Sequence, residues 1–162
     1  MKLPLIYSIT DATSYGEKKF LGMLDHAFNR GLRFVQVRDK QLPLKTRELL
    51  VGHIVEKAQQ VGGVVIVNGD CKLAREAKAN GVHLSSKMLL RATRRPDFEW
   101  CGASCHDEKE LQKAIDLKLD FVVYGPVFPT ATHPGASSIG WDLLEKKISN
   151  RSIPIYALGG IS

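Results

Sequence analysis

Three polar side chains, Gln36, Arg38 and Lys40, alternate along the segment RFVQVRDK. If this segment is a β-strand, alternate residues point to the same side, so all three would face one pocket. Two cations beside an amide fit an anionic ligand such as a phosphate. The alternative interpretation is an arginine in a salt bridge and an exposed lysine at the end of a strand.

A glycine pair near the C-terminus offers a second place for a phosphate. Gly159 and Gly160 directly follow the apolar segment IPIYAL. Glycines let backbone N–H groups approach an oxyanion closely, and the N-terminus of a helix could follow them. Glycine pairs also mark ordinary turns, so a turn without a ligand is the alternative.

The glycine- and proline-containing segment 125–138 is long for a connection between a strand and a helix. Loops of this length are often functional. The hydroxyls of Thr130 and Thr132 and the imidazole of His133 could line a pocket there. For His133 alone, an exposed position in a loop is the plainer interpretation.

Further polar residues lie on or just after short apolar segments, where parallel α/β folds place their active sites. One of them, His83, lies inside the segment GVHL and is expected to be either a packed, hydrogen-bonded histidine or a base. The full set is Thr10, Asp11, Asn68, Asp70, His83, Ser85, Ser86, Ser104, Cys105 and His106.

Short β-branched segments alternate with longer helical patterns along the whole chain. The patterns predict strands over 5–10, 33–38, 64–68, 81–84, 100–104, 120–124 and 153–158. They predict helices over 16–30, 44–60, 72–79, 89–94, 107–117 and 141–148. This alternation is typical of an α/β fold with a parallel sheet, and both a (β/α)₈ barrel and a doubly wound sheet remain open.

The composition narrows the class of protein. Apolar residues make up 44% and charged residues 25% of 162 residues, which suits one folded, soluble domain over 1–162. The net charge of +6 is scattered rather than clustered, which argues against nucleic acid and is compatible with small anionic ligands. Three cysteines and no long apolar run favour a cytoplasmic protein without a disulfide framework or a membrane span.

Seven segments, in order, resemble the thiamin phosphate synthase and thiazole tautomerase superfamily. They are LIYSITD, VQVRDK, VNGD-CKLA, GVHL, GASCH, YGPVFPTATHPG and YALGGIS. GASCHD and GPVFPTATHPG-x3-IGW are most similar to the synthase-like domain that is fused to Nudix hydrolases in some bacteria. The resemblance implies a (β/α)₈ TIM-type barrel. It also implies a transferase that couples a hydroxymethylpyrimidine diphosphate with a thiazole phosphate in thiamin biosynthesis.

The resemblance also implies roles for single residues. Gln36, Arg38, Lys40 and Asn68 match residues that hold the pyrimidine diphosphate, and His83 belongs to the same substrate-binding set. Ser104 matches a serine near the reacting pyrimidine, and we expect it to act in catalysis together with Lys40 and His133. The residues expected to hold the thiazole phosphate are Thr130, Thr132, Gly159 and Gly160.

This sequence differs from the family at the positions of the magnesium ligands. The resemblance implies Mg²⁺ held by two carboxylates, but Gly69 and Met88 stand at those positions and supply none. Asp70 is the nearest replacement and would serve only if its loop shifts. Two alternatives therefore stay open: a metal-independent tautomerase-like enzyme with His83, His106 or His133 as its base, or a non-catalytic domain that binds phosphorylated ligands.

The number of predicted strands also differs from that of the family. Seven strands are predicted, so the last unit of an eight-stranded barrel, with its phosphate-binding loop, is expected to be missing. A barrel with one strand missing exposes strand edges, which favour association. We therefore expect a truncated domain, a homo-oligomer or a gap that a partner covers.

Overall fold

The computed structural model describes residues 3–130, 138–149 and 151–161 of the chain. The chain divides into two compact units, Met1–His83 and Leu84–Ser162, and each is described by itself. No helix among the described residues is long and apolar enough to cross a membrane. A single domain over 1–162 stays a prediction.

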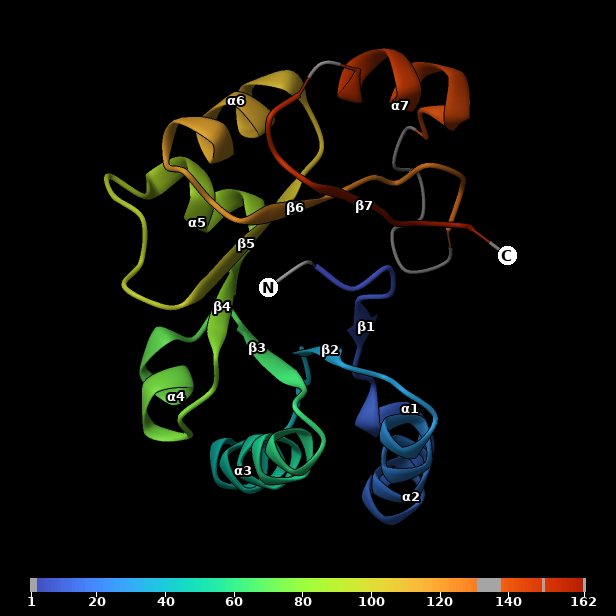
Figure 1. Cartoon of the computed structure of the whole chain (residues 1–162), viewed down its shortest axis with the longest axis vertical. Coiled ribbons are helices and arrows are strands. Elements are labelled where there is room, and N and C mark those ends of the chain that lie inside the picture. Colours follow the sequence, from blue (N-terminus) through green and yellow to red (C-terminus); the bar gives the residue numbers. More distant parts are fainter. Residues whose placement is uncertain (1–2, 131–137, 150, 162) are drawn as a thin grey trace. The chain divides into compact units, whose positions relative to one another are not determined.

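The first unit alternates strands and helices (Figure 1). Its elements are β1 (Ser8–Ile9), α1 (Ala12–Tyr15), α2 (Glu17–Asn29), β2 (Phe34–Val37), α3 (Leu44–Gln60), β3 (Val64–Asn68), α4 (Cys71–Glu76) and β4 (Gly81–Leu84). The strands are parallel and lie in the order β1-β2-β3-β4. Strands β2, β3 and β4 are buried along their whole length, as the apolar segment VVIVN predicts for a strand covered on both faces.

The helices of the first unit pack through apolar stripes. In α2 the buried residues Phe20, Leu24 and Phe28 recur every four positions, which places them on one face. Helix α3 packs on β3 and contacts α2, where Lys57 pairs with Asp25 at 3.6 Å. The apolar stripe therefore fixes each helix on the sheet and leaves the ends of the strands to carry polar residues.

The second unit continues the alternation of strands and helices (Figure 1). Its elements are α5 (Ser86–Arg91), β5 (Trp100–Cys105), α6 (Glu108–Asp116), β6 (Phe121–Tyr124), α7 (Gly140–Ile148) and β7 (Ile155–Ala157). The strands are parallel in the order β5-β6-β7. Asp107 caps α6 by accepting a hydrogen bond from the backbone N–H of Glu110 at 2.8 Å, as its position before the helix predicts.

The strands of both units follow chain order without a reversal. A doubly wound sheet reverses its order at a switch point, whereas a (β/α)₈ barrel does not. The fold is therefore α/β of the TIM-barrel type, and the described residues hold seven of the eight strands of such a barrel.

Candidate functional site

Two buried amides face each other at the ends of β2 and β3. Asn68 Nδ2 donates a hydrogen bond to Gln36 Oε1, and the two side chains are 8% and 1% exposed. Asn68 Oδ1 is buried and accepts no hydrogen bond from the part of the chain that the structure describes. A buried acceptor without a donor is costly, so a ligand that donates a hydrogen bond here would relieve that cost.

The turn after β2 presents the two predicted cations. Arg38 and Lys40 are exposed, and Asp39 between them is buried. The Asp39 carboxylate accepts hydrogen bonds from Thr10 Oγ1 and, at 2.6 Å, from the backbone N–H of Ala12. The backbone N–H of Arg38 donates to Thr10 Oγ1 at 3.0 Å. Asp39 and Thr10 therefore fix the turn, and with it the directions in which both cations leave the backbone.

The electrostatics of this region are those of a cation cluster. Burial lowers the pKa of Lys40 from its usual value, and the nearby Arg38 and Arg47 lower it further. Burial, followed by Lys40 and Arg38, lowers the pKa of His83 to about 3. An anion bound here would relieve the repulsion among these groups.

His83 is neutral and structural. It is 1% exposed, and its Nδ1 lies 3.4 Å from the hydroxyl of Tyr7. A histidine whose pKa is about 3 is a weak base near neutral pH, because few protons bind it there. The geometry favours the packed histidine over the base among the two roles that the sequence left open.

Asp70 does not fit a magnesium ligand. Its Oδ1 accepts a hydrogen bond from the backbone N–H of Leu73 at 3.0 Å and so caps α4, and its Oδ2 pairs with Arg47 Nη2 at 2.9 Å. Among the described residues, no group of three or more histidine, cysteine, aspartate or glutamate side chains could hold a metal ion. Mg²⁺ is usually held by one or two carboxylates together with waters and substrate phosphates, and the contacts of both Asp70 oxygens leave this carboxylate unsuited to that role.

The glycines of the second unit are required by close packing between two loops. A Cβ on Gly160 would lie 2.5 Å from the carbonyl oxygen of Pro129, and one on Gly159 would lie 2.7 Å from Cβ of Pro126. Both glycines have positive φ, at 65° and 101°. The backbone N–H groups of Val127 and Phe128 donate to the carbonyls of Leu158 and Gly159, both at 2.9 Å.

This packing brings two predicted parts of the phosphate site together. The Pro126–Pro129 loop and the glycine pair lie against each other, and Thr130 follows Pro129 directly in the chain. Thr132 and His133 lie outside the described residues. Ser104 is half-buried on β5, where it pairs in register with Val123 of the neighbouring strand β6.

His106 is held in place by three neighbours at the end of β5. Its ring Nδ1 lies 2.6 Å from the carbonyl oxygen of Gly125, which accepts, so Nδ1 carries the proton and Nε2 is the basic nitrogen. Its backbone N–H donates to Glu110 at 2.7 Å, and its carbonyl accepts from the Tyr124 hydroxyl at 3.3 Å. The residue is exposed, and with Nδ1 bonded to Gly125, Nε2 is the ring nitrogen left to act on a ligand.

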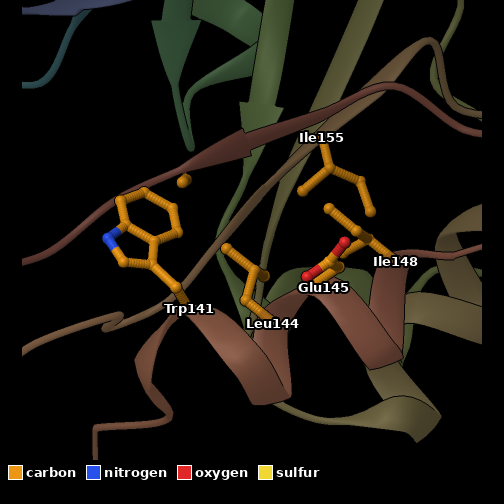
Figure 2. A pocket seen from close by; sticks show the side chains of 6 residues that line it. Trp141, Leu144, Glu145, Ile148 and Ile155 are labelled. Atoms are coloured by element: carbon orange, nitrogen blue, oxygen red, sulfur yellow. The ribbon is translucent and has the colours of Figure 1, made fainter.

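The second unit also holds a cavity of about 290 Å³, between α7 and β7. Figure 2 shows Trp141, Leu144 and Ile148 of the helix and Ile155 of the strand around it. Its lining is mostly apolar and includes none of the predicted site residues. It lies between a helix and a strand, and Ala157, the last residue of β7, is part of its lining.

The chain resembles known proteins over nearly its whole length. A family described as thiamine monophosphate synthase matches residues 6–162. The chain belongs to this family. A relative from Aquifex aeolicus, provisionally named thiamine-phosphate synthase 2, is 34% identical over 100% of this chain and 88% of its own length. The thiamine-phosphate synthase of Hydrogenobaculum is 31% identical over 97% of this chain and 75% of its own length.

Solved structures confirm the fold. A thiamine phosphate pyrophosphorylase from Pyrococcus furiosus superposes with a TM-score of 0.78 at 25% identity, covering 96% of this chain and 75% of that one. A second, from Bacteroides thetaiotaomicron, gives a TM-score of 0.65 at 21% identity, over 97% of this chain and 73% of that one. The predicted family and the predicted TIM-type fold class are both confirmed.

The structure adds residues that the sequence patterns did not single out. Asp39 orients the cation turn through its contact with Thr10, Arg47 joins the cations, and Glu110 holds His106. The signal that could have revealed Asp39 was an acidic residue between two cations at the end of a strand. Arg47 and Glu110 lie on helices among other charged residues, so their spacing alone carried no such signal.

Proposed function

We propose that this chain couples a hydroxymethylpyrimidine diphosphate with a thiazole phosphate, the reaction of a thiamin phosphate synthase. Its family and the small phosphorylated substrates of that family support the proposal. The observation that carries it is the buried Gln36–Asn68 amide pair beside Arg38 and Lys40. An amide acceptor that lacks a donor suits an aminopyrimidine, and two cations at the end of the same strand suit its diphosphate.

In this reaction the bond between the pyrimidine methylene carbon and a diphosphate oxygen breaks, and its electron pair leaves with the diphosphate. The thiazole nitrogen supplies the electron pair of the new C–N bond. Arg38 and Lys40 would stabilise the negative charge that develops on the leaving oxygen, the kind of electrostatic effect that dominates such steps. Thr130 and the backbone N–H groups near Gly159 and Gly160 would bind the phosphate of the thiazole.

Magnesium would supply further stabilisation of the leaving diphosphate in this family. Both oxygens of Asp70 are bonded by groups of the chain itself, so this carboxylate is not left to bind the metal. No step is assigned to magnesium. Ser104 lies on β5, and we expect it to help position the reacting pyrimidine. His133, which lies outside the described residues, stays a candidate for catalysis.

The test mixes both substrates with the full chain and follows thiamin phosphate and diphosphate. We expect one diphosphate for each thiamin phosphate, and loss of both products in Arg38→Ala. Arg94→Ala removes an exposed arginine elsewhere and should leave turnover unchanged. Both substrates binding without any product would contradict the proposal and leave a non-catalytic binding domain.

A second candidate is a metal-independent tautomerase, and the fixed imidazole of His106 favours it. With Nδ1 donating to Gly125, Nε2 could remove a proton from a thiazole phosphate and return it at another atom. Deuterium exchange into a thiazole phosphate, followed by NMR, would test this. Loss of exchange in His106→Gln, but not in His26→Gln on α2, would support the tautomerase, and no exchange in the wild-type chain would exclude it.

A further inference from the structure

The carboxylates that follow the strands of the first unit are all engaged by the chain itself. Asp11, after β1, accepts hydrogen bonds from the hydroxyls of Thr13 and Ser14 at 3.1 and 2.6 Å, one on each oxygen. Asp39, after β2, uses one oxygen for Ala12 and the other for Thr10. Each side chain is therefore satisfied by protein donors rather than left with oxygens directed at a metal.

Asp70, after β3, completes the pattern. One oxygen caps α4 and the other pairs with Arg47. Asn68 Oδ1 is the buried acceptor that stays unsatisfied here among the described residues, and it is a single neutral oxygen. A divalent cation would have to displace a hydrogen bond, a cap or a salt bridge to gain a charged ligand from these three aspartates.

The cationic side chains near these strand ends, in contrast, are accessible to a ligand. Arg38 and Lys40 are exposed on the turn that Asp39 fixes. Arg47, in the first turns of α3, reaches the end of β3, where its guanidinium meets Asp70. The Arg47 side chain is 21% exposed, and its buried Nε donates to no acceptor within the described part of the chain. The influence of Arg38 and Arg47 on Lys40 shows that the three charges act on the same region.

We propose that the first unit binds the diphosphate of its ligand without a divalent cation, with Arg47 as the third cation beside Arg38 and Lys40. The proposal rests on the function proposed above and specifies how its diphosphate is held. Three fixed cations can balance the charge of a diphosphate ester directly, so the site needs no bridging metal. The Asp70 carboxylate, which pairs with Arg47 when no ligand is bound, then competes with the diphosphate for the guanidinium.

Inorganic pyrophosphate is the probe, and calorimetric titration of the full chain is the measurement. We expect the dissociation constant in EDTA to be equal to, or smaller than, that in millimolar Mg²⁺, because free Mg²⁺ competes for pyrophosphate in solution. Binding that tightens tenfold or more in Mg²⁺ would overturn this inference and leave the proposed function intact. Absence of binding in both buffers would overturn the proposed function as well.

One variant and a matched control locate the effect. Arg47→Gln should weaken pyrophosphate binding by about tenfold, as expected for a lost charge-assisted contact. Lys57→Gln, on the same helix and paired with Asp25, should leave binding unchanged. If Arg47→Gln does not fold, judged by circular dichroism, Arg47→Lys keeps the charge and should bind within a few-fold of wild type. Unchanged binding in a folded Arg47→Gln chain would exclude Arg47 from the site.

The Asp70→Asn variant distinguishes binding without a metal from binding through a metal at Asp70, because the two predict opposite changes in pyrophosphate affinity. Asparagine keeps the helix cap, and removing the negative charge should tighten pyrophosphate binding a few-fold in EDTA. A metal ligand at Asp70 would produce the opposite result, a loss of affinity in Mg²⁺. Asp25→Asn removes the same charge from α2 and should change neither value.

Discussion

The two units of the chain hold different kinds of candidate partner for phosphate groups. In the first unit the partners are side chains: two cations on a turn, a third on α3, and a pair of buried amides. In the second unit they are backbone groups on loops that pack closely around Gly125, Gly159 and Gly160. A side-chain site fails when one group is removed, whereas a backbone site fails when its packing is disturbed.

The two units also fix their candidate residues differently. Asp39 and Thr10 hold the cation turn through a few buried hydrogen bonds. The glycine pair is held by contacts in which even one added methyl group would clash. Charge should therefore govern ligand affinity in the first unit, and loop packing should govern both stability and affinity in the second.

The largest effect is expected in the first unit. Arg38→Ala should weaken pyrophosphate binding by about 100-fold, since hydrogen bonds to charged groups contribute about 1.5–3 kcal/mol each. Titration calorimetry of the folded variant measures the change. An affinity within threefold of wild type would show that the turn after β2 is not the anion site.

The glycine pair should give the next largest effect. Gly160→Ala should lower the free energy of unfolding by about 2–3 kcal/mol, because its φ is 65° and the new Cβ would meet Pro129. Urea unfolding measures the loss, and phosphate affinity should fall with it.

Gly22→Ala is the matched control, since it lies inside α2 with nothing within 4 Å of the added Cβ. It should raise the free energy of unfolding by about 0.5–1 kcal/mol. Equal effects from the two substitutions would contradict the packing role of Gly160.

A pH effect distinguishes the first unit from the second. The pKa of His83 is about 3 in the folded chain and about 6.5 when unfolded, so the unfolded chain binds the proton first. Stability should fall as the pH drops from about 6.5 toward 3, by up to about 1.4 kcal/mol per pH unit. Urea unfolding of wild type and His83→Gln between pH 5 and 7 isolates this term, and parallel curves would refute it.

The smallest effect is expected at the support of His106. Ser86→Ala removes a donor to Glu110, the carboxylate that also accepts from the backbone N–H of His106. The free energy of unfolding should fall by about 1 kcal/mol, the usual value for one hydrogen bond. A loss above 3 kcal/mol would contradict this account, because Glu110 keeps its hydrogen bond from the backbone N–H of His106 in the variant.

Periodicity predicted most of the fold. The limits of α3, β3 and β4 agree with the apolar patterns residue for residue, since each pattern is long or wholly buried. The strand predicted over 5–10 was too long, because Leu5 and Ile6 are 96% and 69% exposed and strand pairing begins at Ser8. The short helix α1 carries no periodic pattern and was not predicted.

The candidate site was predictable in its residue types and not in its contacts. Alternation along the segment RFVQVRDK singled out Arg38 and Lys40, but β2 ends at Val37, so both lie on the turn after the strand, where they are exposed. The contacts between Asp39 and Thr10, and between Arg47 and Asp70, join residues 29 and 23 positions apart, which no local pattern reveals. The resemblance to the Nudix-fused domain and the formation of oligomers stay predictions.

The most direct test of a site in each unit is to measure how many molecules of each ligand bind to one chain. Pyrophosphate is titrated into the full chain, and a thiazole phosphate is then titrated into the saturated complex. We predict one equivalent of each ligand, with Arg38→Ala weakening the first and Gly160→Ala weakening the second. Competition between the two ligands for a single equivalent would contradict the assignment of one phosphorylated substrate to each unit.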